Sequence, residues 1–475
     1  MQTQLFIDGT WRDGADGETF AVEDPATTET IAEVASATPA DATAAVDAAA
    51  AAQTGWAATP PRERAELLRS AWEAMQDNKQ DLAELIVAES GKPMDDALGE
   101  VDYAAEFLRW NSEEAVRIRG EVGIAPSGDK RILVHHVPVG VVVMVTPWNF
   151  PAAMLTRKLA PALAAGNAVV AKPASATPLT SLALADLFHE VGFPAGTINV
   201  TPAGDSGGWF DAATDHTATR MISFTGSTEV GRGLLEVASQ RILKSVMELG
   251  GNAPFIVFED ADIDKAVEGA MMAKMRHSAE TCTAANRFFV HADVVDEFSE
   301  AFGQAMRETK VGNGRDEGVG CGPMIDADAL DRIAGLVDDA VANGATVVTG
   351  GERLDREGHF YAPTVLRDVD AGDPITDEEI FGPVAPLITF TDTDEMLERA
   401  NDTEMGLTGY VFTEDLRRGL AVSERVQQGM IGLNRGLVSD PAAPFGGMKQ
   451  SGLGREGSTD GIYEFTETQY IATEW

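Results

Sequence analysis

Apolar residues in the first hundred positions predict a short strand pair followed by helices. Thr38 precedes a proline and an alanine-rich run, and Thr59 precedes two prolines, so each is expected to cap a helix. The second of these helices keeps its apolar residues at helical spacing: Leu67, Leu68, Ala71 and Met75. A third helix is expected from about Asp81 to Ser90, with Gly91 at its C-terminal end.

Residues 117–137 change to an alternation of apolar and polar positions around a Ser-Gly-Asp turn. This pattern predicts a β-hairpin, and the edges of such a hairpin need to be covered. The last strand of the chain, YEFTETQYIATEW, is expected to pair with it.

Strands and helices then alternate from Val139 to Val237, which is typical of a parallel sheet that binds a nucleotide. The segment VGVVVMV contains no polar residue, which predicts a central strand covered on both faces. A second alternating region from about Pro254 to Gly432 includes RFFVH, TVVTGG, PLITF and GYVFT. We expect it to form a second α/β unit.

Length and charge exclude several classes of protein. The 475 residues are enough for two to four domains, and an apolar content of 44% excludes a chain disordered by charge. With 36 basic and 76 acidic residues the net charge is −40, which excludes nucleic acid and anionic membranes as main partners. The acidic residues are spread along the chain. They are consistent with a well-solvated surface or with adaptation to high salt, and we favour adaptation to salt.

The cysteine count favours a reducing compartment. Cys282 and Cys321 are the only cysteines, so no disulfide framework is implied. The N-terminus lacks the basic and apolar segments of a signal peptide, and no apolar run approaches the ~20 residues that span a bilayer. We therefore expect a cytoplasmic protein. Cys321 lies in a glycine-rich turn and is expected to be structural.

Cys282 lies among small and polar residues in MRHSAETCTAANR, which favours a reactive thiol, although a lone cysteine is often a small buried hydrophobe. Glu248 ends an apolar run and precedes two glycines, which we interpret as a flexible turn beside a candidate general base. A strand from Pro254 and a helix from near Asp262 lie between them. This connection could bring the two side chains into one cleft.

Three further positions lie at the ends of predicted strands. Asn149 could donate to an oxyanion or cap the helix that begins near Ala152, and its spacing leaves both roles open. Lys172 ends the next strand, where the ribose or phosphate of a cofactor would lie. Gly226 and Ser227 form a strand-to-helix turn that favours a pyrophosphate, with an ordinary turn as the alternative.

Several motifs occur in order along the chain: TPWNFP, KPAS, FTGSTEVG, ELGGN, the Cys282 segment, EEIFGPV and PFGGMKQSGLGREGS. Together they resemble the aldehyde dehydrogenase superfamily over nearly the whole chain, and most closely its succinate semialdehyde dehydrogenase branch. The resemblance implies an α/β fold with three parts, which are a Rossmann-like dinucleotide-binding domain (1–116 and 138–249), an α/β catalytic domain (250–433) and a β oligomerisation arm (117–137 and 455–475). It also implies a homodimer or homotetramer.

The resemblance implies oxidation of an aldehyde to a carboxylic acid through a cysteine thiohemiacetal and a thioester. Cys282 would be the nucleophile, Glu248 the base that activates water, and Asn149 would hold the oxyanion with the backbone N–H of Cys282. The implied cofactor-binding residues are Thr146, Pro147, Trp148, Lys172, Ser175, Gly226, Ser227, Leu249, Glu379 and Phe381. Many members carry glutamate at the Ser175 position, and because serine does not repel a 2′-phosphate we predict NADP, with NAD also usable.

In the branch that the chain resembles, two arginines and a serine hold a distal carboxylate of the substrate; here they are Arg157, Arg276 and Ser439. Paired hydrogen bonds from arginine suit a carboxylate, which predicts succinate semialdehyde as the substrate. Alternatively the arginines pair with carboxylates of the protein, and the substrate is an uncharged aldehyde. A catalytically silent relative is the third possibility. No metal site is expected. Glu280 would raise the pKa of the Cys282 thiol if it pointed inward, and we expect it to point away or to pair with a cation.

Overall fold

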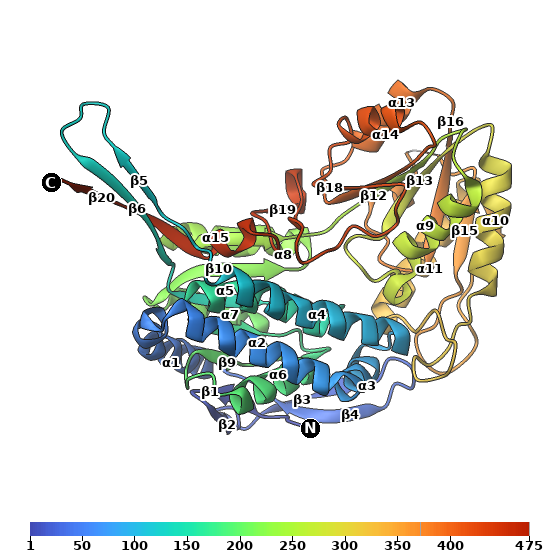
Figure 1. Cartoon of the computed structure of the whole chain (residues 1–475). Helices are drawn as coiled ribbons and strands as arrows, with labels where there is room; N and C mark the ends of the chain where they lie inside the picture. The colour runs from blue at the N-terminus through green and yellow to red at the C-terminus, as the bar shows by residue number, and fades with distance from the viewer. Residues whose placement is uncertain (371, 475) are drawn as a thin grey trace.

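Two sheets with their covering helices form the body of the molecule, and a third, small sheet projects from it (Figure 1). The computed structural model describes residues 1–370 and 372–474. The N-terminal half builds the first sheet and its helices, and most of the C-terminal half builds the second. None of the helices in the described residues is long and apolar enough to cross a membrane.

The first sheet has eight strands in the order β19-β11-β10-β7-β8-β9-β1-β2. The five strands from β11 to β9 are parallel, and antiparallel strands border them on both sides. Its strands are β1 (Leu5–Ile7), β2 (Thr10–Arg12), β7 (Val141–Val145), β8 (Val169–Lys172), β9 (Ile198–Val200), β10 (Thr219–Thr225), β11 (Lys244–Glu248) and β19 (Gly452–Leu453). The associated helices are α1 (Pro39–Ala58), α2 (Pro61–Asp77), α3 (Lys79–Ser90), α4 (Met94–Glu114), α5 (Pro151–Ala165), α6 (Pro178–Val191), α7 (Ser206–Asp215) and α8 (Thr228–Arg241).

Strand β7 shows why this sheet is buried on both faces. Val142 and Met144 pack into one hydrophobic core, whereas Val141 and Val143 pack into another on the opposite face. Side chains of a strand alternate between its two faces, so helices must cover both sides of the sheet. The prediction of a doubly covered central strand is confirmed.

The second sheet has seven strands in the order β14-β15-β16-β13-β12-β17-β18, and all pairs are parallel except β14 with β15. Its strands are β12 (Ala253–Val257), β13 (Ala285–His291), β14 (Thr346–Thr349), β15 (Thr364–Arg367), β16 (Val384–Phe390), β17 (Thr408–Phe412) and β18 (Met430–Leu433). The helices are α9 (Ile263–Met275), η1 (Arg276–Ala279), α10 (Val295–Glu308), α11 (Ala327–Ala342), α12 (Pro374–Asp377), α13 (Thr393–Asn401) and α14 (Leu416–Ser423). The short helix η2 (Lys449–Ser451) precedes β19.

The third sheet joins the predicted hairpin to the end of the chain (Figure 1). Strands β5 (Glu121–Ile124) and β6 (Arg131–Pro138) form the hairpin, and β20 (Thr466–Thr473) pairs with β6 in antiparallel register. The last strand begins later than predicted, because helix α15 (Asp460–Glu464) takes up its expected first residues. Trp475, the last residue of the predicted strand, lies outside the described residues. A separate hairpin, β3 (Thr19–Glu23) with β4 (Thr30–Ala35), lies near the N-terminus.

One of the two predicted threonine caps is correct. Thr38 and Asp41 form a reciprocal capping box at the start of α1. Thr59 instead ends α1, since its hydroxyl donates to the carbonyl of Gly55, and α2 begins at Pro61 without a side-chain cap. Gly91 ends α3 with φ +74°, as predicted for a left-handed C-terminal residue.

Candidate active site

A cleft of about 280 Å³ runs along the carboxyl ends of β7, β10 and β11. This edge of a parallel sheet is where ligands bind in open α/β folds. The residues that line the cleft are Pro147, Trp148, Asn149, Met154, Thr225, Gly226, Ser227, Glu248, Leu249, Gly250, Cys282, Arg332, Glu379 and Phe381. All three predicted catalytic side chains are among them.

Glu248 is the last residue of β11, and only 2% of it is exposed. The two glycines that follow it allow close packing and do not form the flexible turn that we expected. A Cβ atom on Gly250 would lie 2.7 Å from an oxygen of Glu379, and one on Gly251 would lie 2.6 Å from the carbonyl oxygen of Cys282. Neither glycine adopts a left-handed conformation. The motif therefore lets the segments that carry Glu379 and Cys282 approach β11.

Helix α9 and the turn η1 deliver Cys282 to the same cleft. The predicted strand and helix between Glu248 and Cys282 are present as β12 and α9, with Asp262 as the N-cap. Cys282 is partly exposed and packs beside three buried apolar side chains: Leu407, Met430 and Phe445. A partly exposed thiol in a cleft is placed to react.

The carboxyl group of Glu248 opposes the ionisation of the Cys282 thiol. Burial raises the pKa of Glu248 to about 7, and the nearby Arg157 acts against this rise. Burial, followed by the charge of Glu248, raises the pKa of the Cys282 thiol well above its ordinary value. The thiol is therefore neutral in this environment. It needs a base to become the attacking thiolate, and Glu248 is the nearest candidate.

The amide of Asn149 is directed toward the Cys282 segment. Its Nδ2 atom donates to the carbonyl of Glu280 at 2.9 Å, so one of its two N–H groups is used there. The N-terminus of α5 is held instead by Glu100, whose Oε1 accepts from the backbone N–H groups of Ala152 and Ala153. The helix-cap alternative for Asn149 is thus wrong.

Three successive residues before the nucleophile have left-handed backbones, with φ of 48° for His277, 52° for Ser278 and 68° for Ala279. This conformation costs a residue with a side chain roughly 1–2 kcal/mol. Contacts from other elements hold the segment in place. Asp96 accepts the N–H of His277 at 2.8 Å, and the hydroxyl of Ser278 accepts the N–H of Gly322 at 2.8 Å.

Glu280 points away from Cys282, as we expected, but it pairs with no lysine or arginine among the described residues. Its Oε1 accepts the backbone N–H of Ile325 at 3.0 Å, and the nearest ring nitrogen of His277 lies 3.9 Å from its Oε2. The side chain is fully buried, and burial raises its pKa well above the ordinary value. Its hydrogen bond to Ile325 anchors the segment before the nucleophile.

Seven of the predicted cofactor residues line the cleft: Pro147, Trp148, Gly226, Ser227, Leu249, Glu379 and Phe381. Ser227 caps α8, accepting from Val230 at 3.3 Å, and Glu379 accepts the N–H of Gly251 at 3.2 Å. The rings of Trp148 and Phe381 meet edge to face at 5.5 Å. Burial raises the pKa of Glu379 to about 7.

The other three predicted cofactor residues lie outside the lining of this cleft. Thr146 is buried beside the end of β8, where its N–H donates to the carbonyl of Lys172 at 3.2 Å. The ammonium group of Lys172 donates to the carbonyl of Pro173 at 3.1 Å, and burial lowers its pKa to about 8. Ser175 is exposed and follows Pro173 in the segment after β8.

Four residues of the lining were not predicted from the sequence: Met154, Thr225, Gly250 and Arg332. Thr225 ends β10 within the FTGS motif, so its place at a strand end was a usable signal. Arg332 lies on α11 and donates to the carbonyls of Glu379 and Ile380. No recognised motif surrounds Arg332, so its position could not be predicted from local sequence.

The chemistry of the cleft fits a nicotinamide dinucleotide. The hydroxyl of Thr225 is buried and has no hydrogen-bond partner in the described part of the chain. The start of α8 presents backbone N–H groups beside Gly226 and Ser227, which suits a pyrophosphate. The carboxyl group of Glu379 suits the hydroxyls of a ribose.

None of the three predicted substrate residues lines the cleft. Arg157 is 1% exposed and forms ion pairs with Glu456 and, at 3.6 Å, with Glu248. Arg276 is partly exposed, with its guanidinium carbon 5.7 Å from the ring centre of Phe150. Burial raises the pKa of the Tyr103 phenol, and the charges of both arginines act against this rise. Ser439 is partly exposed in the segment after β18.

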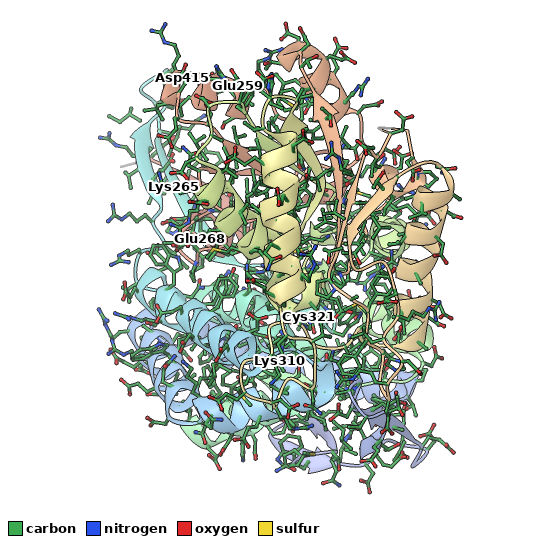
Figure 2. All side chains as sticks on the ribbon, turned by 90° about the vertical axis from the view of Figure 1, so that its right-hand side faces the viewer. Glu259, Lys265, Glu268, Lys310, Cys321 and Asp415 are labelled. Carbon is green, nitrogen blue, oxygen red and sulfur yellow. The ribbon has the colours of Figure 1, made fainter. Side chains whose placement is uncertain are left out.

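The second cysteine does not line this cleft. Cys321 is fully buried, and its backbone N–H donates to the carbonyl of Lys310 at 3.2 Å; Figure 2 shows both residues at the lower end of α10. Burial raises the pKa of its thiol to about 12. This environment fits the structural role that we predicted.

Comparison with known proteins gives matches over nearly the whole chain. Residues 11–471 match the model of the aldehyde dehydrogenase family. A succinate-semialdehyde dehydrogenase of Paenarthrobacter nicotinovorans is 52% identical, over 93% of this chain and 98% of the relative. A glutarate-semialdehyde dehydrogenase of Pseudomonas putida is 47% identical, over 99% and 98%. The crystal structure of an NADP-dependent enzyme of E. coli superposes with a TM-score of 0.99 at 45% identity, covering 100% of this chain and 98% of the other.

Proposed function

The chain belongs to the aldehyde dehydrogenase family, and from this premise we propose that it oxidises succinate semialdehyde to succinate with NADP⁺, with NAD⁺ also accepted. Cys282, Glu248 and Asn149 carry the reaction, and their meeting in one cleft supports these roles. Semialdehyde dehydrogenases among the similar proteins support the substrate class.

In the proposed mechanism the Cys282 sulfur adds to the aldehyde carbon while Glu248 takes the thiol proton. Asn149 and the backbone N–H of Cys282 stabilise the oxyanion of the resulting thiohemiacetal. The nicotinamide cofactor, when bound, supplies the acceptor for the hydride that leaves this carbon. Glu248 then releases the thiol proton to solvent, and water attacks the thioester and gives a proton to the ionised Glu248. The carbon–sulfur bond breaks, which releases the acid and the Cys282 thiolate.

The observation that carries the choice of substrate is the state of Arg276. Among residues 1–370 and 372–474 its guanidinium forms no ion pair. Burial raises the pKa of the nearby Asp96, and the charge of Arg276 acts against this rise without an ion pair between the two. In a chain with 76 acidic and 36 basic residues, an arginine beside the active site without a carboxylate partner is available to an anionic substrate. We assign Arg276 and Ser439 to the distal carboxylate, whereas Arg157, the third residue expected there, is paired with Glu456 and Glu248.

The cofactor preference rests on Ser175 and on the match to an NADP-dependent enzyme. Ser175 is exposed beyond β8 and carries no charge, so it would not repel a 2′-phosphate. The similar E. coli structure is named NADP-dependent. We therefore place NADP⁺ ahead of NAD⁺.

We further propose the division of the chain that the sequence suggested. Residues 1–116 and 138–249 bind the dinucleotide, residues 250–433 carry the nucleophile, and the arm of residues 117–137 and 455–475 joins copies into a homodimer or homotetramer. The exposed apolar side chains of β5, Val122 at 74% and Ile124 at 61%, support a partner at this edge. A cytoplasmic location and adaptation to high salt remain part of the proposal.

The test is the ratio of kcat/KM for succinate semialdehyde to that for butanal, measured with each cofactor. Recognition of the distal carboxylate predicts a preference of at least about 100-fold, equivalent to ~2.7 kcal/mol of transition-state binding. Glutarate semialdehyde serves as the longer acid. Equal rates for the semialdehyde and butanal would leave a general aldehyde dehydrogenase, and cofactor binding without turnover would indicate a silent relative.

A further inference from the structure

The contacts of Arg157 include the base of the candidate active site, and its NH2 atom also donates to the sulfur of Met154 in the cleft lining at 3.2 Å. Its side chain descends from α5, in which every residue is buried, and its Nε pairs with Glu456. Its NH2 atom lies 3.6 Å from Oε2 of Glu248, and the ring of Phe445 lies 4.1 Å from the guanidinium carbon. Arginine commonly stacks on an aromatic ring while it pairs with carboxylates. These contacts fix the guanidinium behind Glu248.

The buried cluster around Arg157 has one more positive charge than negative charges when Glu248 is not counted. Lys158 also pairs with Glu456, at 2.6 Å from its Oε1, so two cations meet one anion behind the cleft. All four side chains are at most 3% exposed, and charges shielded from water interact strongly. An ionised Glu248 therefore makes this buried cluster neutral.

Glu248 depends on this cluster because little else holds its carboxylate. Neither of its oxygens accepts a hydrogen bond in the described part of the chain. Free lone pairs suit a base that must accept a proton from water. Burial raises the pKa of Glu248, and Arg157 acts against this rise more strongly than Lys158 or the Cys282 thiol does.

We propose that Arg157 is a positioning residue for Glu248, which keeps this base ionised and directed at Cys282 during hydrolysis of the thioester. The inference rests on the proposed function for the roles of Cys282 and Glu248, but it does not depend on the substrate's distal carboxylate. In this step water loses a proton to Glu248, its oxygen bonds to the acyl carbon, and the carbon–sulfur bond breaks to give the acid and a thiolate.

The pH dependence of this step follows from the groups that face Glu248. These are Arg157 and Lys158 from α5, Glu456 after β19, Cys282 after η1, and Glu379 after α12. Hydrolysis needs the ionised base, so its rate should rise with pH through about 7, the pKa of Glu248. Loss of Arg157 removes a cation and moves this limb to higher pH. Loss of Glu456 removes an anion and moves the limb to lower pH.

Butanal tests the inference, because it carries no carboxylate for an arginine to hold. We expect Arg157→Gln to keep a burst of reduced cofactor of full amplitude, slower than in the unmodified enzyme because Glu248 also takes the thiol proton. The steady-state rate that follows should be about 100-fold below that of the unmodified enzyme, the usual size of a general-base contribution. The acid limb of kcat should move to higher pH, and Arg157→Lys should restore most of the rate. The matched control is Arg315→Gln, which removes the guanidinium paired with buried Asp24 and should change neither burst nor limb.

Butanal kinetics of Arg157→Gln identical to those of the unmodified enzyme, with only a raised KM for succinate semialdehyde, would overturn the inference and leave Arg157 as a substrate ligand. If Arg157→Gln does not fold, Glu456→Gln provides the test through the opposite shift of the acid limb, and an unmoved limb would also overturn it. The burst is recorded with saturating succinate semialdehyde as well. Failure of the unmodified enzyme to prefer the semialdehyde would count against the proposed substrate and leave the burst result intact.

Discussion

Arg157 and Arg276 differ in the charged groups that surround them, although the charges of both favour a lower pKa of the Tyr103 phenol. Arg157 is buried in α5 and paired with Glu456 and Glu248. Arg276 is partly exposed at the end of α9, and within the described residues it has the face of Phe150 and no carboxylate as its contact. A guanidinium always carries its charge, so the difference lies in what neutralises it.

This difference separates two tasks that one residue type can perform. A paired and buried arginine holds a group of the protein in place, because moving it would leave carboxylates buried without compensation. An arginine without a carboxylate partner has its hydrogen-bond donors available to a ligand. We therefore assign Arg157 to the base and Arg276 to the substrate.

Stability should separate the two arginines by the largest margin. Arg157→Met leaves two buried carboxylates facing Lys158 alone, and loss of one partner of a buried pair costs about 3–5 kcal/mol. Arg276→Met breaks no ion pair and should cost less than about 1 kcal/mol. The free energies of unfolding in urea measure both values. Equal losses in the two variants would remove the basis of the comparison.

Substrate selection should separate them next. Arg276→Met should lower kcat/KM for succinate semialdehyde by about 100-fold, or ~2.7 kcal/mol, because the distal carboxylate loses its guanidinium partner. Butanal should lose far less. Ser439→Ala removes one hydroxyl donor to the same carboxylate, and a loss of about tenfold is expected. A parallel fall for both aldehydes in Arg276→Met would mean that it does not contact the substrate carboxylate.

Strain in the backbone that follows Arg276 should have a smaller effect on the free energy of unfolding, and relieving it should stabilise the protein. Ala279 adopts φ +68°, so Ala279→Gly should relieve strain and raise the free energy of unfolding by about 1 kcal/mol. Ala284 is a buried neighbour of the nucleophile without a positive φ, and Ala284→Gly should lower the same quantity by about 0.5–1 kcal/mol. Thermal and urea unfolding would show the opposite signs. Loss of stability in both variants would show that no strain is stored at Ala279.

The salt concentration should produce the smallest difference between the two arginines. Raising the salt concentration from about 0.1 M to about 1 M shortens the range of surface electrostatics severalfold, so the KM for succinate semialdehyde should rise by a few-fold through the partly exposed Arg276. The buried pairs of Arg157 should not respond. Arg276→Met should abolish the salt dependence of KM, and its persistence would place the sensitive charge elsewhere.

The sequence was sufficient where local chemistry decides the structure. Glu248 and Cys282 could be placed in one cleft because a strand and a capped helix lie between them, and both elements are present. Thr59 was misassigned because a threonine before proline can also end a helix, and here its hydroxyl turns back to Gly55. The glycines after Glu248 were read as flexible because their use in close packing depends on segments that meet only in the folded chain.

Long-range contacts explain most of what the sequence did not predict. The pairing of Arg157 with Glu456 joins α5 to a segment near the C-terminus, and no local pattern links the two. Arg332 is held at the cleft by hydrogen bonds to the carbonyls of Glu379 and Ile380, which follow α12, and no local motif indicates these contacts. The left-handed backbone at Ala279 contradicts the preference of its own residue type and depends on contacts from α4 and from residues 322–325.

The most direct test is the acyl group on Cys282 during turnover of butanal. The enzyme is quenched in acid at steady state, and the peptide that carries Cys282 is examined by mass spectrometry for the unmodified protein, Arg157→Gln and Arg276→Gln. The account predicts that the thioester accumulates in Arg157→Gln, where hydrolysis is slow, and does not accumulate in Arg276→Gln. Accumulation in neither variant, or to the same extent in both, would contradict the separate roles of the two arginines.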